Sequence, residues 1–199
     1  MADDVEIIEK PTVFQGYFHI DRYIVRHRLY DGGWSGPISR EIFERGHATS
    51  VLCYDPERDV VGLVEQFRAG ALAAGWNPWL VELVAGIIDE GETPENVARR
   101  EAEEEAGAVV TDLVPVHHYL VTPGGSSETM IIYCGRIDST KFKGTHGLPE
   151  EGEDIRALTL PADEAFAWVA DGRICNSMTI IALQWLALNR QSLRAKWLA

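Results

Sequence analysis

The chain has 199 residues, and 46% of them are hydrophobic, which is enough for one compact domain or for a core with a small appendage. Its formal net charge is −13, with 31 acidic residues against 18 basic ones. Because a nucleic-acid backbone is bound through clustered Lys and Arg, and the sequence has no such cluster, we exclude a nucleic-acid partner. A small anionic ligand remains compatible with this charge if metal ions offset it locally.

The first region of the chain, residues 1–46, has the pattern of a small β domain. Aromatic and β-branched residues partly alternate with polar ones over 12–28, Asp31-Gly32-Gly33 marks a turn, and residues 38–44 predict a further strand. A piece of about 45 residues is too small to bury a core of its own. We therefore expect it to pack on the rest of the chain or on a second subunit.

The second region, residues 47–199, combines strands with a few helices. Strands are predicted over 48–54 and 60–68, joined by a turn at 55–58, and an apolar run follows at 80–88. Further strands are predicted over 113–121, 129–137 and 154–160, and two closing helices over 162–170 and from 177 to about 197. These elements do not alternate as βαβ units, so the fold class is α+β.

Residues 93–106 predict one helix with clear start and stop signals. Thr93 is a suitable N-cap, Pro94 fits the first helical position, and Glu95 favours the positive end of the helix dipole. Gly107 stands where a helix commonly ends. The helix therefore begins and ends at residues that fix its length.

This helix carries an acidic face. Glu101 and Glu105 are four residues apart and lie one turn above each other, with Glu104 at the border of the same face. Like charges at this spacing weaken a helix by a few tenths of a kcal/mol per pair, and a hard divalent cation such as Mg²⁺ would relieve the repulsion. The alternative is an ordinary solvated acidic surface, since charge runs are usually exposed.

The spacing around these glutamates matches a longer motif. It reads Gly, five residues, Glu, seven residues, Arg-Glu, an apolar residue, any residue, Glu-Glu, any residue, Gly and an apolar residue. Every fixed position is met, by Gly86, Glu92, Arg100, Glu101, Glu104, Glu105 and Gly107. This motif is the box of the Nudix hydrolase family, which the chain resembles, and within it the ADP-ribose pyrophosphatases. Segments 39–46, 64–68, 77–86, 122–128 and 146–148 are similar to the same subfamily.

The resemblance implies a set of metal ligands on and near this helix. The positions matching Glu101 and Glu105 bind the metals, together with the backbone carbonyl at the position of Ala85. Glu104 matches a box glutamate that is a ligand in some members. Arg100 is expected to hold the carboxylates in place rather than to touch the substrate.

A second acidic segment follows Gly147 and contains Glu150, Glu151, Glu153 and Asp154. By resemblance it is a mobile loop, in which the position matching Glu151 activates the water and the one matching Glu153 binds a metal. The two glutamates could exchange these roles. Without the resemblance, a solvated acidic loop is the simpler interpretation.

Four side chains are candidates for binding the substrate. Arg40 and Arg68 suit the phosphates, because Arg is always charged and makes bidentate contacts, although each could be a surface ion pair. Glu128 follows a glycine-rich turn and could bind a ribose hydroxyl, or be a solvated loop acid. Tyr17 resembles a family aromatic that stacks on adenine, or is an ordinary strand aromatic.

The resemblance implies the Nudix fold, a mixed sheet between helices, and hydrolysis of ADP-ribose to AMP and ribose 5-phosphate with Mg²⁺ or Mn²⁺. It also implies a homodimer in which N-terminal strands are exchanged. Two alternatives stay open: a Nudix pyrophosphatase for another nucleotide sugar or dinucleotide, and a sensor that binds ADP-ribose without hydrolysis.

The expected location is the cytoplasm. Cys53, Cys134 and Cys175 are odd in number and far apart, which argues against a disulfide framework and a zinc site and favours buried reduced thiols. No stretch approaches the roughly 18 apolar residues that a membrane span needs, and residues 1–10 do not resemble a signal peptide. We therefore expect no membrane partner.

Overall fold

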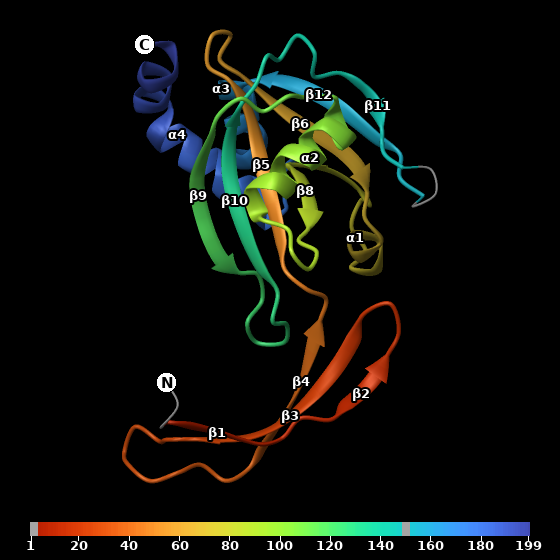
Figure 1. The fold of residues 1–199 in the computed structure, drawn as a ribbon, viewed down its shortest axis with the longest axis vertical. Helices are drawn as coiled ribbons and strands as arrows, with labels where there is room; N and C mark the ends of the chain where they lie inside the picture. Colours follow the sequence, from red (N-terminus) through yellow and green to blue (C-terminus); the bar gives the residue numbers. More distant parts are fainter. Residues whose placement is uncertain (1–3, 149–151) are drawn as a thin grey trace. The chain divides into compact units, whose positions relative to one another are not determined.

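The computed structural model describes residues 4–148 and 152–199. The chain forms two compact units (Figure 1). The first contains the residues up to His47 together with Leu120–Thr129, and the second contains Ala48–Tyr119 and Met130–Ala199. The sequence did not indicate that the segment 120–129 belongs with the N-terminal strands.

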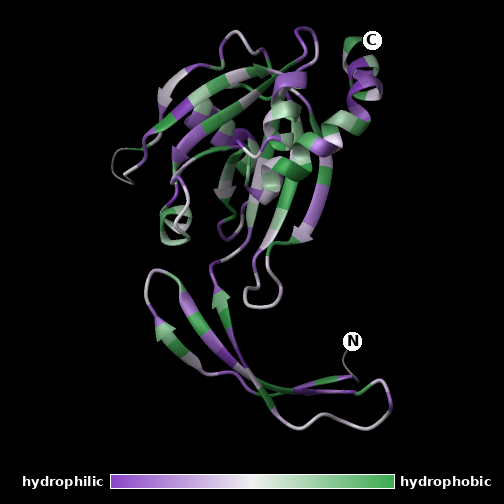
Figure 2. Cartoon of the chain, turned by 180° about the vertical axis from the view of Figure 1, so that it is seen from behind, coloured by the Kyte–Doolittle hydropathy of each residue, from purple (hydrophilic) through white to green (hydrophobic). Residues whose placement is uncertain are grey.

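The first unit is a four-stranded antiparallel sheet. Its strands are β1 (Val5–Glu9), β2 (Thr12–Gln15), β3 (His19–His27) and β4 (Ile38–Glu44), and β3 pairs with the other three. Hydrophobic and hydrophilic residues are mixed along these strands (Figure 2), and Asp21 is their single buried residue. Large apolar side chains on β1 and β2 are exposed, including those of Ile7 and Phe14. This unit has little interior of its own.

The second unit is built on an eight-stranded mixed sheet. Its strands are β5 (Ala48–Asp55), β6 (Val60–Phe67), β7 (Trp79–Glu82), β8 (Val84–Ile87), β9 (Leu113–Leu120), β10 (Thr129–Arg136), β11 (Gly144–His146) and β12 (Ile155–Pro161). The order is β11-β12-β6-β5-β10-β9, while β7 pairs with β6 and β8 with β5. Strands β5 and β10 are parallel, and β5 and β6 are antiparallel. The predicted mixed sheet is confirmed.

Helices lie on both faces of this sheet: α2 (Pro94–Ala106) on one, and α3 (Ala162–Ala170) and α4 (Ser177–Leu198) on the other (Figure 1). The apolar side of α2, which includes Ala98 and Ala102, packs on Val51 and Val64 in a buried cluster. On the opposite face, the ring of Tyr54 lies 6.4 Å from that of Trp197. A short helix, α1 (Ala69–Ala73), follows β6.

Helix α2 has the limits that its capping residues predict. The Thr93 side chain accepts a hydrogen bond from the Asn96 N–H at 3.3 Å, and Pro94 is the first helical residue. Gly107 adopts a left-handed φ of 61°, and its N–H donates to the Glu103 carbonyl at 2.9 Å. These contacts fix which side of the helix faces the sheet, and so where its glutamates lie.

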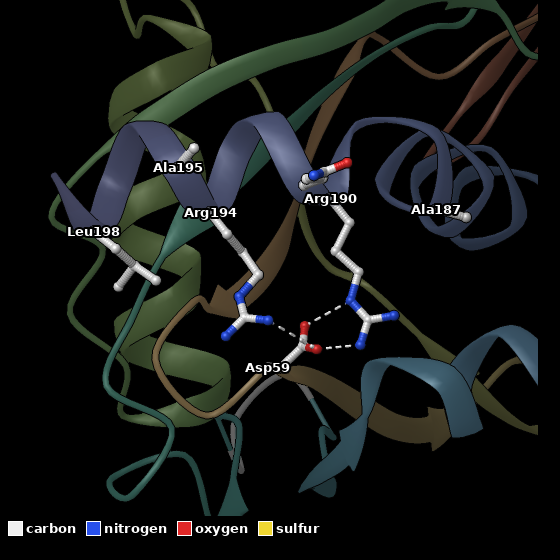
Figure 3. Close-up of a pocket in the computed structure, with 7 residues that line it drawn as sticks. Asp59, Ala187, Arg190, Arg194, Ala195 and Leu198 are labelled. Atoms are coloured by element: carbon white, nitrogen blue, oxygen red, sulfur yellow. Dashed lines mark hydrogen bonds and ion pairs between the residues drawn. The ribbon is translucent and has the colours of Figure 1, made fainter.

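The C-terminal half of α4 is held on the turn between β5 and β6 (Figure 3). The Arg190 Nε donates to the Asp59 carboxylate at 2.8 Å, and the Arg194 Nε donates to the Pro56 carbonyl at 2.9 Å. A cavity of about 440 Å³ lies beside these residues. Its arginine charges face Asp59 and Asp163, so the ion pairs serve to anchor the helix.

Two of the three cysteines are buried, as the sequence predicted. Cys53 and Cys134 are buried free thiols, whereas Cys175 is only partly buried. Within residues 4–148 and 152–199, no helix is both long enough and apolar enough to cross a bilayer.

Candidate active site

Helix α2 meets strand β8 at a buried carboxylate. The side chain of Glu105 accepts a hydrogen bond from the Ala85 N–H at 3.3 Å, and the residue is only 4% exposed. The pKa of Glu105 is raised to about 8, chiefly by burial and also by the charge of Glu101, while the Ala85 N–H and the charge of Arg68 oppose the shift. Among the described residues, no Lys or Arg forms an ion pair with Glu105.

Glu101 lies one turn earlier, against the backbone of Gly86. A Cβ on Gly86 would collide with the Glu101 carboxylate, so the close approach requires glycine at this position of the motif. Burial raises the pKa of Glu101 to about 7, with Arg100 lowering it and Glu104 raising it. Two carboxylates that resist ionisation therefore lie together on one side of α2.

One arginine faces three of the motif glutamates. The Arg100 Nη1 lies 3.0 Å from Glu101 Oε1 and 2.9 Å from Glu104 Oε2, and its Nε lies 3.4 Å from Glu92 Oε1. The side chain of Glu104 is 43% exposed, so it lies at the outer edge of the group. A single positive charge shared among three carboxylates leaves this region negative.

A second buried carboxylate lies on β7. Glu82 is 4% exposed, and its Oε2 accepts a hydrogen bond from the Arg68 Nε at 2.7 Å. Burial raises the pKa of Glu82, while the charge and hydrogen bond of Arg68 oppose the shift. The residue pattern does not indicate a role for Glu82, because its burial follows from the pairing of β7 with β6.

The predicted base and one predicted metal ligand come from the segment after β11. Glu151 and its neighbour Glu150 lie outside the described residues. The Glu153 carboxylate accepts a hydrogen bond from the Leu148 N–H at 3.1 Å. Strands β11 and β12, which flank this segment, both pack against α2.

The other predicted substrate-binding residues belong to the first unit. Tyr17 is largely exposed, with its ring edge-to-face to Phe18 at 4.7 Å. Arg40 is an exposed residue of β4 whose Nη1 donates to the Ser39 carbonyl at 2.8 Å. Glu128 is buried, and its carboxylate lies 3.4 Å from the Arg45 guanidinium.

A family model for the NUDIX domain matches residues 44–175, which include the whole motif. The chain belongs to the Nudix family. It is 49% identical over 195 residues to the ADP-ribose pyrophosphatase of Escherichia coli (strain K12), covering 98% of this chain and 93% of that protein. It is 42% identical over 197 residues to the ADP-ribose pyrophosphatase of Haemophilus influenzae, covering 98% and 91%.

A solved structure described as an ADP compounds hydrolase has the same fold. It matches with a TM-score of 0.72 over 98% of this chain and 96% of that one, at 18% sequence identity. The Nudix fold with a mixed sheet, predicted from the sequence, is therefore confirmed.

The Nudix family implies a divalent cation, and the α2 carboxylates fit one. Their oxygens are hard donors, and burial raises the pKa of Glu101 and Glu105, so a cation beside them would favour their charged form. Within the described residues, no three His, Cys, Asp or Glu side chains converge as a ready metal site. A bound cation would complete its ligands with backbone carbonyls, water or substrate.

Proposed function

We propose that this Nudix protein hydrolyses the pyrophosphate bond of ADP-ribose to give AMP and ribose 5-phosphate. The observation that carries the proposal is the pair Glu101 and Glu105, one turn apart on α2. Glu105 is buried and forms no ion pair among the described residues, and Glu101 shares Arg100 with two other glutamates. Such a pair is suited to hold a cation beside a diphosphate. The names of the relatives from Escherichia coli and Haemophilus influenzae support ADP-ribose as the substrate.

The ion we propose is Mg²⁺, for which Mn²⁺ could substitute. Glu101, Glu105, Glu153 and the backbone carbonyl of Ala85 would hold it. When bound, the cation supplies positive charge that offsets the phosphate oxygens and favours ionisation of a nearby water. The Leu148 N–H donates to Glu153 Oε2, so Glu153 could contact the ion through Oε1 without losing this hydrogen bond.

The chain's own groups would orient these ligands and move the proton. Arg100 holds Glu101 and Glu104 at fixed places, which supports our assignment of Arg100 as an orienting group and of Glu104 as an auxiliary carboxylate. We assign Glu151 as the general base that accepts a proton from the attacking water.

We propose a role in substrate recognition for each of the four candidate side chains. Arg68 would bind the phosphates, and Arg40 would add a second cationic contact. Tyr17, which is exposed on the first unit, is available to stack on adenine. Glu128 would bind a ribose hydroxyl through the carboxylate that it now shares with Arg45.

We further propose that residues 1–46 act as a dimerising β domain beside a catalytic domain at 47–199. Exposed apolar side chains on β1 and β2, such as Ile7 and Phe14, support a contact with a second copy. We place the enzyme in the cytoplasm, where the three free cysteines would remain reduced.

Release of AMP from a small panel tests the proposal: ADP-ribose, ADP-mannose, NADH and diadenosine polyphosphates, with Mg²⁺ present and then removed by EDTA. We expect the largest kcat/KM for ADP-ribose and no turnover with EDTA. GDP-mannose, assayed by GMP release, is the control for the nucleobase, because it carries guanine in place of adenine.

The two alternatives give different results in this assay. Preferred hydrolysis of another member of the panel would identify a pyrophosphatase for that nucleotide. Binding of ADP-ribose without turnover would indicate a sensor. The complete set of motif glutamates favours hydrolysis over sensing.

A further inference from the structure

The contact between Arg68 and Glu82 leaves part of the arginine available. The Glu82 carboxylate engages the Nε of Arg68 at 2.7 Å. Within the described residues, no other side chain hydrogen-bonds to this guanidinium, and the Arg68 side chain is 41% exposed. The two Nη groups, which form the bidentate edge of an arginine, therefore remain free.

Folding stability does not account for this pair. Glu82 is buried, and its pKa lies above the ordinary value even with the arginine in contact. The pair thus does not fully offset the cost of burying the carboxylate. A buried acid that its ion pair does not fully compensate, one strand away from Ala85, calls for a functional reason.

The surroundings of Arg68 supply that reason. Glu82 ends β7, and the Ala85 N–H of the following strand β8 donates to Glu105 at 3.3 Å, so the Arg68–Glu82 pair lies near the proposed cation ligands. A flexible arginine without a fixed partner would be drawn toward Glu105, which has no ion-pair partner among the described residues. The ion pair with Glu82 holds the guanidinium in place and so keeps it from pairing with Glu105.

We propose that Glu82 is a positioning residue, which anchors the Arg68 Nε so that the two Nη groups bind the diphosphate of the substrate and stay off Glu105. This inference rests on the proposed function, because it assigns the substrate's diphosphate to Arg68. Glu82 itself touches neither substrate nor cation. Its contribution is preorganisation, since an arginine that is already oriented loses less conformational freedom on binding.

Glu82→Gln is the direct test, because it keeps the size of the side chain and removes the charge. The loss of one charge-assisted contact predicts a KM for ADP-ribose about tenfold higher or more, with kcat within about threefold of wild type. The matched control is Glu65→Gln. Glu65 pairs with Arg156 at 2.6 Å on the other face of β6, so we expect KM and kcat within about twofold of wild type.

A double-mutant cycle separates positioning from a structural role. In an Arg68→Ala background, Glu82→Gln should not change KM further, because the residue through which it acts is absent. Arg68→Lys, which keeps the charge and loses the bidentate fork, should raise KM as much as Glu82→Gln does. Because the Arg68 side chain is partly exposed, Arg68→Lys should fold and give a result even if Glu82→Gln does not fold.

Equilibrium binding of ADP in the presence of Mg²⁺ keeps this test independent of the reaction. Weaker ADP binding by Glu82→Gln supports positioning even if wild-type protein fails to release AMP from ADP-ribose, which would refute only the proposed function. An unchanged KM and unchanged ADP affinity in Glu82→Gln would overturn the proposal. The proposal would also be overturned if Glu82→Gln weakened ADP binding equally in the presence and in the absence of the Arg68 side chain.

Discussion

Two buried carboxylates near opposite ends of strand β5 have pKa values that are shifted in opposite directions. Asp55, its last residue, accepts hydrogen bonds from the N–H groups of Arg58 and Ser139, the Ser139 hydroxyl and the Arg58 guanidinium at 2.7–3.0 Å. Burial raises its pKa, but these donors outweigh burial and lower the pKa to about 2. Near the start of β5, where β8 pairs with it, Glu105 accepts one backbone hydrogen bond, and its pKa is raised to about 8.

The difference separates structure from function. Hydrogen bonds to the charged form lower a carboxyl pKa, and burial without them raises it. Asp55 is stabilised by the protein itself and fixes the turn after β5. Glu105 lacks such compensation, and Glu101 shares a single arginine with Glu92 and Glu104, which leaves charge for an external cation to offset.

The largest effect is expected at a carboxylate that moves a proton. Glu151→Gln should lower kcat by about two to four orders of magnitude, because the general base is lost. The affinity for Mg²⁺ should change little, which would distinguish Glu151 from the α2 ligands. Steady-state kinetics and calorimetric Mg²⁺ titration measure both quantities, and an almost unchanged kcat would reject the assignment.

At Asp55, the last residue of β5, substitution by Asn should lower the stability of the protein and leave its turnover unchanged. The amide cannot accept all the donors that surround Asp55, so the free energy of unfolding should fall by about 2–4 kcal/mol. We expect kcat for the folded variant to stay within about twofold of wild type. Chemical denaturation followed by kinetics at a permissive temperature tests this, and a large loss of kcat with intact stability would contradict the comparison.

The pH dependence of stability should differ in sign between the two carboxylates. For Asp55, whose folded pKa is lowered, the stabilisation is present above the unfolded value near 3.8 and is lost as the pH falls toward 2. For Glu105, whose folded pKa is raised, the stabilisation is present below 4.5 and is lost as the pH rises toward 8.

Thermal denaturation in EDTA between pH 5 and 8 measures the second effect. Each carboxyl with a raised pKa contributes a slope of at most about 1.4 kcal/mol per pH unit. In Glu105→Gln, the free energy of unfolding should fall less steeply as the pH rises. In the wild type, Mg²⁺ should restore stability at pH 8. The same decline in Glu105→Gln would show that another group causes it.

Local signals predicted much of the second unit. Thr93, Pro94 and Gly107 determine the limits of α2 through contacts within a few residues, so the sequence predicted the helix and the spacing of its glutamates. The apolar run at 80–88 belongs to two strands, β7 and β8. Leu83 separates them, because its N–H donates to the Thr179 hydroxyl at 3.0 Å instead of joining the sheet.

The missed features depend on distant parts of the chain. Strands β1 and β11 and helix α1 have only five, three and five residues, so no periodicity marks them. Glu82 is acidic and would be expected at the surface, yet strand pairing buries it beside Arg68. The roles predicted for Tyr17, Arg40, Glu128 and Glu151 remain predictions.

Calorimetric titration of Mg²⁺ into metal-free protein tests the central claim most directly. Wild-type protein should bind the ion, and Glu101→Gln/Glu105→Gln should show neither this binding nor release of AMP from ADP-ribose. Retained binding and turnover in the doubly substituted protein would contradict the account.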